Sequence, residues 1–374
     1  MNLISHLSNT AKHKPVMLWI DHSLGGGTET YSYNQFKKLG HKYHIFRLQY
    51  RPHNRIYVLT NQKNKSTVQT SDLQQIYIQI CDIHPTEIVV NNLVGYDNTL
   101  NILDVVKNIK ENADNKINVS FRGHDFQCIC PSYNLIDSDG RYCNAKCNHQ
   151  CEKCWAKKRL APDDTTHNIL KSGATDIKLW RDKWGNFLTN VTDQIIVFSN
   201  DTANILLRAY PGIENKISVI PHETQKYPHV RTKPHSGINI AVLGNISHAK
   251  GASVINEMAR LLPQCDDVKI IIIGTMANAD ERIIVHGKYK TRALPKIMKQ
   301  HQVDVVFIPS IWPETFSYTT SEAISMGLPV ACYDIGAPAE RVSKYAKGLV
   351  LDNISPSENL SQIIKFIYEK RSIK

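Results

Sequence analysis

The chain lacks several features that would have assigned it to a class at once. None of its apolar runs approaches the roughly 18–20 residues that a membrane-crossing helix needs, and its first residues lack the charged start and long apolar stretch of a signal peptide. It also contains no internal repeat and no low-complexity segment. We therefore expect a cytoplasmic protein with reduced thiols rather than a membrane-spanning chain or a repeat array.

Acidic residues are also in short supply, since 34 Asp and Glu stand against 45 Lys and Arg, which gives a formal net charge of +11. Such a balance suits an acidic partner: a nucleotide diphosphate, an anionic membrane surface or a nucleic acid. The basic residues are dispersed and no zinc-finger histidine spacing occurs, which argues against a nucleic-acid-binding module. At 374 residues the chain exceeds the usual size of a single core, so we expect two domains.

Short apolar segments alternate with helical patterns along the whole chain, which is typical of parallel sheets covered by helices on both faces. A polar, proline-bearing segment at 223–236 reads as the linker between two such units. We therefore predict an α/β protein with two Rossmann-like, doubly wound domains. The expected strands are residues 16–21, 43–48, 87–91, 117–121 and 194–199 in the first domain, and 238–243, 268–273, 305–309 and 329–333 in the second.

The most informative stretch, residues 312–322, carries two glutamates where an apolar strand leads into a helix. A turn before that helix would leave its first backbone N–H groups aimed outward, as a seat for phosphate. Glu314 at the rim and Glu322 along the helix would then accept hydrogen bonds from hydroxyl groups on either side of a diphosphate. Two solvated residues on a helix face would be the better interpretation of an isolated pair, but the preceding strand favours a sugar-nucleotide site.

Glu314, the seven residues after it, Glu322 and the run 323–330 resemble the signature of retaining GT-B glycosyltransferases of family 4. In that family the first glutamate contacts the donor sugar and the second contacts the ribose. Thr315 and Ser317 stand where the family usually has glycines, and Ser317 is able to cap the helix. The resemblance places the donor phosphates against the helix start, at Thr315, Phe316 and Ser317.

The resemblance also implies an arrangement of domains. Residues 1–222 would form the acceptor-side Rossmann-like domain and residues 223–356 the nucleotide-sugar-binding one, facing each other across a central cleft. The last helix, within 357–374, would pack back onto the first domain.

Glycines 25–27 follow the first expected strand. Because glycine tolerates a positive φ and carries no side chain, such a run lets the backbone approach a ligand closely. An ordinary tight turn explains it equally well on local evidence. Doubly wound folds bind ligands at the ends of such strands, and the resemblance assigns Gly26 and Gly27 to donor binding.

The segment 244–251 follows the first strand of the second domain. Lys250, at the start of a helix, would neutralise a leaving diphosphate; a solvated helix lysine is the alternative. Where the family usually has an arginine this chain has Asn245, an uncharged donor, so that His248 would help to complete the phosphate clamp.

Two further sites rest on the resemblance. The loop 285–289 is similar to the family loop near the nucleobase, which assigns Gly287 and Tyr289 to donor binding. His124 stands where family members keep a histidine facing the donor sugar, with a role in orientation and charge stabilisation. A local hydrogen-bonded pair with Asp125, itself a weaker candidate, is the alternative.

These assignments lead to a mechanism with His124, Lys250 and Glu314 as the catalytic residues. The leaving phosphate departs on the face from which the acceptor hydroxyl attacks, through an oxocarbenium-like state. The protein stabilises the diphosphate charge and aligns the two substrates. This scheme requires no catalytic metal.

Cysteines form a second cluster, with six of the nine inside residues 128–154. In a reducing compartment, four thiolates from short loops indicate a structural zinc ion. Cys151 and Cys154 have the usual spacing, and Cys130 and Cys143 complete the set because residues 130–143 resemble an insertion in a subgroup of bacterial surface-polysaccharide glycosyltransferases. An iron–sulfur cluster and free buried thiols are the alternatives. The reserve ligands are Cys128, Cys147 and His149, and the three remaining cysteines resemble core residues: Cys81, Cys265 and Cys332.

The resulting hypothesis is a retaining glycosyltransferase that moves a sugar from a nucleotide-diphosphate donor to a glycan or lipid-linked glycan in bacterial O-antigen or capsule assembly. The positive charge would allow peripheral association with the cytoplasmic face of the inner membrane. No nucleic-acid partner is expected. Two alternatives stay open: a catalytically silent glycosyltransferase-like scaffold, favoured by Asn245, and a zinc-containing nucleic-acid-binding protein.

Overall fold

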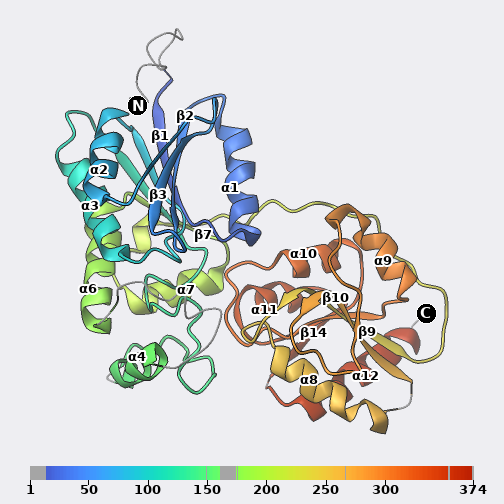
Figure 1. Cartoon of the computed structure of the whole chain (residues 1–374). Helices are drawn as coiled ribbons and strands as arrows, with labels where there is room; N and C mark the ends of the chain where they lie inside the picture. Colours follow the sequence, from blue (N-terminus) through green and yellow to red (C-terminus); the bar gives the residue numbers. More distant parts are fainter. Residues whose placement is uncertain are drawn as a thin grey trace. The chain divides into compact units, whose positions relative to one another are not determined.

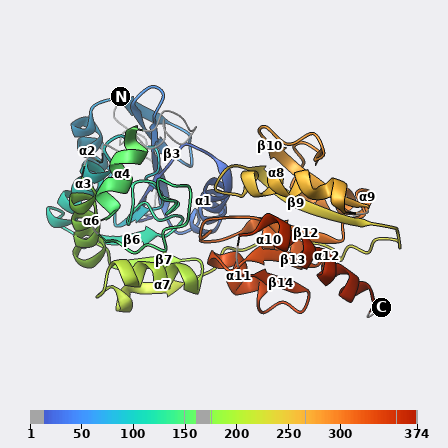
Figure 2. The same cartoon turned by 90° about the horizontal axis from the view of Figure 1, so that it is seen from below.

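The computed structural model describes residues 14–148, 150–160, 174, 176–265, 267–352 and 354–372. The chain divides into two compact units (Figures 1 and 2). The first unit runs to Ile220 apart from residues 199–201, and the second contains those three residues and everything from Pro221 onward. The predicted boundary lay two residues further along, between 222 and 223.

The first unit is built on an eight-stranded sheet in the order β4-β3-β2-β1-β5-β6-β7-β8. The pairs from β2 through β1 to β8 are parallel, whereas β2, β3 and β4 form an antiparallel edge. Since β1, β5 and β6 are adjacent and parallel, their carboxyl ends meet at one edge of the sheet. The strands are β1 (Val16–Asp21), β2 (His44–Arg51), β3 (Ile56–Asn61), β4 (Thr67–Thr70), β5 (Glu87–Val90), β6 (Asn118–Arg122), β7 (Gln194–Val197) and β8 (Ile217–Val219).

Helices cover both faces of this sheet (Figure 1). Helix α1 lies on one face, and α2, α3 and α6 lie together on the other, where α3 contacts both of its neighbours. Local sequence sets two of the helix starts, because Asp72 and Asp176 accept hydrogen bonds from the first backbone N–H groups of α2 and α6. The helices are α1 (Gly26–Leu39), α2 (Leu73–Asp82), α3 (Thr99–Glu111), α4 (Gln150–Leu160), α6 (Ile177–Asn186), which continues as a wider π turn (Phe187–Val191), and α7 (Asn200–Ala209).

The second unit holds a six-stranded, fully parallel sheet in the order β11-β10-β9-β12-β13-β14. Its strands are β9 (Ile238–Ile246), β10 (Val268–Met276), β11 (Ile284–Val285), β12 (Val305–Ile308), β13 (Val330–Tyr333) and β14 (Gly348–Leu351). Its helices are α8 (Ala252–Leu261), α9 (Leu294–Gln300), α10 (Tyr318–Ser325), α11 (Gly336–Val342) and α12 (Pro356–Ser372), with short 3-10 turns at Leu262–Gln264 and Thr291–Ala293.

Helix α12 corrects one expectation. We expected the last helix to pack on the first domain, but it belongs to the second unit, where it contacts α8 and β14. Near its end, the Arg371 guanidinium donates to the Gly237 carbonyl and to Asp304 Oδ1, both at 2.7 Å. The sequence pattern shows that this helix has a buried stripe, but not which core covers it.

No helix in the described part of the chain combines the length and the apolarity needed to cross a membrane.

Candidate functional site

Two loops of the second unit lie side by side at the carboxyl ends of β9 and β12. The Ile311 N–H donates to the Ala249 carbonyl at 3.0 Å. Gly251, with φ of 83°, packs so tightly that a Cβ atom there would lie 2.2 Å from the Pro309 carbonyl oxygen. The structure therefore brings the loop that carries Lys250 against the segment that leads to Glu314, as a shared phosphate and sugar site requires.

Glu314 is held rigidly and is only 5 % exposed. The Ser310 hydroxyl donates a short hydrogen bond to its Oε1 atom, and its carbonyl accepts from the Ala337 N–H at 2.8 Å. Gly336, with φ of 69°, leaves no room for a side chain, because a Cβ atom would lie 2.7 Å from the Glu314 nitrogen. The Ser310 hydroxyl therefore orients the carboxyl group, while the Ala337 and Gly336 contacts position the Glu314 backbone.

The start of helix α10 has the predicted cap. Ser317 has an extended backbone, and its hydroxyl accepts a hydrogen bond from the Thr320 N–H at 3.4 Å. The prediction that Ser317 caps this helix is confirmed.

Glu322 lies on α10 with only 8 % of its surface exposed. Burial raises the pKa of its carboxyl group to about 7, against the opposing effect of the nearby Tyr227 hydroxyl. The pKa of Tyr227 is raised to about 12 by burial and by the Glu322 charge, and burial together with the same charge raises the pKa of Tyr289. Glu322 and the predicted Tyr289 therefore share one environment, to which Tyr227 adds a residue that the sequence did not reveal.

Arg341 and His222 were also missed, because no local motif marks either one. From α11, the Arg341 guanidinium lies 4.5 Å from the Phe316 ring centre and donates to the Ser317 carbonyl at 2.9 Å and to the Ser321 hydroxyl. Burial lowers its pKa to about 10, against the opposing effect of the Glu314 charge.

The His222 ring stacks on Phe316 with 4.4 Å between ring centres, and its Nδ1 atom lies 2.9 Å from the Tyr318 hydroxyl oxygen. Burial, with the nearby Arg341 charge, lowers the pKa of His222 to about 3. Phe316 is thus enclosed by a neutral imidazole and a guanidinium, which fixes the turn that follows Glu314.

The remaining predicted residues of this unit are placed as follows. Lys250 is half-buried and forms no ion pair with another described residue, and His248 is exposed. Asn245 lies in β9, where its Oδ1 atom accepts from the Thr275 hydroxyl at 2.9 Å. Gly287 has φ of 91°, as a turn after β11 requires.

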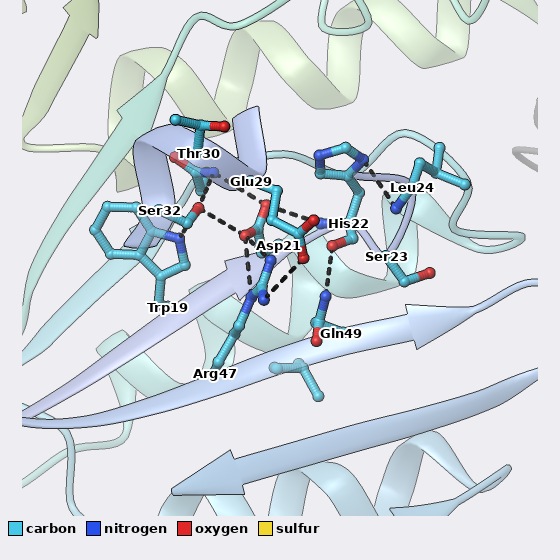
Figure 3. A network of polar contacts seen from close by, with 12 residues as sticks. Trp19, Asp21, His22, Ser23, Leu24, Glu29, Thr30, Ser32, Arg47 and Gln49 are labelled. Carbon is cyan, nitrogen blue, oxygen red and sulfur yellow. Dashed lines mark hydrogen bonds and ion pairs between the residues drawn. The ribbon is translucent and has the colours of Figure 1, made fainter. Parts of the chain in front are cut away.

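In the first unit, the predicted glycine turn follows β1. Gly25 and Gly26 have φ of 78° and 80°, values that side chains rarely adopt, and α1 begins at Gly26. Directly before this turn lies a buried polar network around Asp21 (Figure 3), which the sequence analysis did not identify. Gly27 belongs to the first turn of α1.

His124 follows β6, three residues after Phe121. Its Nε2 atom lies 3.0 Å from Asn91 Oδ1, and its ring contacts those of Tyr31 and Phe198 at 4.9 and 4.6 Å between centres. The Asp125 carboxylate accepts from Asn92 Nδ2 and the Gln127 N–H at 2.7 and 2.8 Å. Burial raises the pKa of Asp125 to about 6.

The cysteines correct the metal prediction. Five of them line one pocket of about 550 Å³, yet no group of three or more His, Cys, Asp or Glu residues within the described ranges is placed to hold a metal ion. Two of these thiols accept other hydrogen bonds: Cys151 from Arg181 and Cys154 from the Ser138 N–H, both at 3.3 Å. The proposed zinc set of Cys130, Cys143, Cys151 and Cys154 is therefore not supported. His149 lies outside the described residues.

Burial, together with the nearby Cys130, Cys151 and Cys154, raises the pKa of Cys143 to about 11. None of the nine cysteines, all of which the structure describes, forms a disulfide.

Comparison with known proteins finds one family model that matches part of the chain. The family model that matches is "Glycosyl transferases group 1", over residues 223–373. The match covers less than half of the chain and falls on the second unit. A curated relative, the lipopolysaccharide core biosynthesis mannosyltransferase LpsB of Rhizobium meliloti (strain 1021), is 25 % identical over 187 residues, which is 43 % of this chain. The match spans half the length of that relative.

Solved structures resemble the whole chain. The lipopolysaccharide outer core galactosyltransferase WaaB matches with a TM-score of 0.58 and 11 % identity, over 95 % of this chain and 91 % of that one. Anabaena Alr3699/HepE in complex with UDP-glucose matches with a TM-score of 0.55 and 14 % identity, over 95 % and 90 %. Sucrose-phosphate synthase from Thermosynechococcus elongatus matches with 0.59 and 13 %, also over 95 % and 90 %. At these identities the likeness shows the fold alone, which is GT-B with two Rossmann-like domains.

Proposed function

We propose that this protein is a retaining glycosyltransferase of family 4, which transfers a sugar from a nucleotide-diphosphate donor to a glycan or lipid-linked glycan acceptor. The observation that carries the proposal is the fixed Glu314 carboxyl group beside the Lys250 loop, inside a domain that matches glycosyl transferases group 1. A buried carboxyl group and an unpaired lysine on adjacent loops suit a ligand with hydroxyl groups and phosphates.

The donor would be held by groups of the second unit. Lys250 and the backbone amides at the start of α10 bind the diphosphate, helped by His248 and Asn245. Glu314 accepts hydrogen bonds from the sugar, and Glu322 accepts them from the ribose. Gly287 and Tyr289 lie beside the base. The structure of HepE in complex with UDP-glucose supports a nucleotide-sugar donor.

The reaction breaks the bond between the sugar C1 atom and the phosphate oxygen, and forms a bond from C1 to the acceptor oxygen on the same face. The acceptor proton passes to the departing phosphate oxygen, so the products are the glycoside and a nucleoside diphosphate. Lys250 stabilises the charge that develops on that phosphate. His124 and Glu314 orient the sugar, while Gly26 and Gly27 let the backbone of the first unit approach the donor.

The acceptor assignment rests on charge and on relatives. LpsB and WaaB are named as lipopolysaccharide core enzymes, so a glycan of bacterial surface polysaccharide is the proposed acceptor class. A net charge of +11 favours peripheral association with the anionic cytoplasmic face of the inner membrane. This scheme uses neither a catalytic metal nor a nucleic-acid partner.

A thermal-shift panel tests the donor site. Full-length protein is heated with UDP-, GDP-, dTDP- and CMP-linked sugars, and one base is expected to raise the melting temperature of the second unit. At a hundredfold excess over the dissociation constant, the stabilisation is about 2.7 kcal/mol, or about 5–10 °C for a domain of this size. Glu322→Ala is expected to abolish the shift, whereas Glu281→Ala, at a side chain that is 88 % exposed, keeps it.

A turnover assay distinguishes an active transferase from a catalytically silent scaffold. Release of nucleoside diphosphate with a polysaccharide acceptor extract supports the transferase, whereas donor binding without any transfer favours the silent scaffold. Asn245 is the observation behind that second candidate, because the Thr275 hydroxyl already occupies its side-chain oxygen. No shift with any nucleotide sugar, in folded protein, would contradict both.

A further inference from the structure

A line of hydrogen bonds crosses the carboxyl ends of three neighbouring strands in the first unit. Asp21 is the last residue of β1, Asn91 directly follows β5, and His124 follows β6. Because β1, β5 and β6 are adjacent in the sheet, these side chains meet at one edge. Asp21 and Asn91 are both fully buried, so their polar atoms need hydrogen-bond partners within the protein.

The direction of these bonds is set at one end by groups that are only able to donate. Arg47 Nε and Nη2 donate to Asp21 Oδ2 at 3.1 and 2.7 Å (Figure 3). Trp19 Nε1 donates to Ser32 Oγ at 3.1 Å, so the Ser32 hydroxyl hydrogen is directed to Asp21 Oδ2, 2.7 Å away. The His22 N–H donates to Asp21 Oδ1 at 3.0 Å. Asp21 therefore acts only as an acceptor, as an ionised carboxylate does.

The Asn91 side-chain amide continues this line of hydrogen bonds, and its orientation is fixed by Asp21. Its Nδ2 atom lies 3.0 Å from Asp21 Oδ1 and 3.1 Å from Ser32 Oγ, which uses both amide hydrogens. The reversed amide would place its oxygen against the Asp21 carboxylate, so the orientation is fixed by charge. Asn91 Oδ1 then faces His124 Nε2 at 3.0 Å. An amide oxygen carries no hydrogen, so the imidazole nitrogen must be the donor.

We propose that Asp21 and Asn91 are positioning residues that fix the tautomer and ring plane of His124. The neutral ring carries its proton on Nε2 and its lone pair on Nδ1, and the contacts with Tyr31 and Phe198 hold the ring against rotation. The consequence for sugar transfer rests on the proposed function, since it requires His124 to face the donor sugar. The tautomer itself follows from the network alone.

Nitrogen NMR tests the tautomer directly. Full-length protein labelled with 15N-histidine is studied at a mildly alkaline pH, and His124 is assigned by the cross-peaks that disappear in His124→Gln. We expect a protonated-type shift for Nε2 and an unprotonated-type shift for Nδ1. The opposite assignment, or an average of the two, would overturn the proposal.

Two neighbouring asparagines supply a matched pair of variants. Asn91→Leu removes the acceptor and is expected to release the tautomer, giving averaged nitrogen shifts for His124. Asn92→Leu removes a neighbouring buried amide that bonds to Asp125 and the Val94 N–H instead, and is expected to leave the shifts of His124 unchanged. An unchanged tautomer in Asn91→Leu would refute the positioning role. If that variant fails to fold, Asn91→Ser is used, which keeps an oxygen that is able to rotate and to donate.

Ser32→Ala probes the network one step further back. It removes one of two acceptors for the Asn91 amide but leaves the bond to Asp21, so His124 is expected to keep its Nε2 proton. Loss of the tautomer in Ser32→Ala would show that the Asp21 charge does not fix the amide.

Kinetics then separates this inference from the proposed function. With a donor identified by thermal shift, Asn91→Leu is expected to lower kcat about tenfold with KM for the donor nearly unchanged, equivalent to about 1.4 kcal/mol. Asn92→Leu is expected to keep kcat within about twofold of the unmodified protein. A fixed tautomer in a protein without any transferase activity would support the network and refute the proposed function. An averaged tautomer in a protein with transferase activity would refute the network and support the proposed function.

Discussion

The raised pKa of Glu322 makes a quantitative prediction about stability. Its carboxyl group has a pKa of about 7 in the folded protein, because burial penalises the charged form. An unfolded glutamate titrates at its ordinary value, near 4.5. The folded state therefore holds a proton that the unfolded state has lost between these two values, and stability falls as the pH rises through this window.

The size of the effect follows from the two pKa values. One pH unit of difference corresponds to about 1.4 kcal/mol, so complete ionisation of Glu322 costs the second unit about 3 kcal/mol. The cost is absent below pH 4.5 and complete above pH 7. Glu322→Gln, which removes the ionisation and nearly keeps the shape, is therefore expected to be more stable than the unmodified protein above pH 7, with no gain in acid.

Hydrogen exchange of the full chain, read on peptides of β12 and β13, measures this quantity in the second unit. A unit-specific readout is needed, because Asp125 in the first unit has a pKa of about 6 and titrates in the same range. Glu281→Gln is the control, since that side chain is 88 % exposed. Equal pH slopes for Glu322→Gln and Glu281→Gln between pH 4.5 and 7 would refute the reasoning.

Three further outcomes are expected. His222→Gln should reduce the loss of stability on acidification. With a pKa of about 3, the folded state resists the protonation that the unfolded histidine undergoes below about pH 6.5. Hydrogen exchange at pH 4 and pH 7 measures the free energy of unfolding, and an equal loss of stability in acid for the variant and the unmodified protein would contradict the prediction. Gly251→Ala should destabilise the second unit by about 2 kcal/mol or more, because the new Cβ atom would lie 2.2 Å from the Pro309 carbonyl oxygen and the backbone has a positive φ. A melting temperature within 1 °C of the unmodified protein would contradict this prediction. Lys250→Met should lower kcat/KM for the donor by roughly a hundredfold while leaving the melting temperature of the free protein unchanged, and equal turnover would remove this lysine from the mechanism.

Much of the fold could be predicted because apolar strands and helical patterns are local signals. All nine expected strands occur, and the carboxyl ends of β1, β9 and β12 carry the predicted loops. The antiparallel strands β3 and β4 and the short edge strands β8, β11 and β14 were missed. Edge strands are short and half-exposed, so they lack the continuous apolar run that marks a buried strand.

The site was predictable where a motif lies within one loop and its helix. Ser317 shows this, because a cap depends on residues two or three positions away. Arg341 and His222 lie outside the motif at 312–322 and reach it only through tertiary packing. The predicted zinc set is not supported, and the cause is again tertiary packing. The spacing of Cys151 and Cys154 is a local signal, but a metal site requires thiols from distant segments to lie together, and local spacing does not specify their positions.

The network around Asp21 also bears on how mutational data for this protein should be interpreted. Arg47 lies on β2 and donates to Asp21, and Trp19 points from β1 toward α1, where it donates to Ser32. Each donates a hydrogen bond that determines what its partner does: Trp19 directs the Ser32 hydroxyl hydrogen to Asp21, and Arg47 holds Asp21 as an acceptor. Arg47→Met would remove two of the donors that hold Asp21 as an acceptor, so activity would fall without any loss of contact at the sugar. Trp19→Phe acts on the network through Ser32 and is expected, like Ser32→Ala, to leave the His124 tautomer unchanged. Residues that determine proton placement at a distance would then appear in a functional screen as sensitive positions with no visible partner in the reaction.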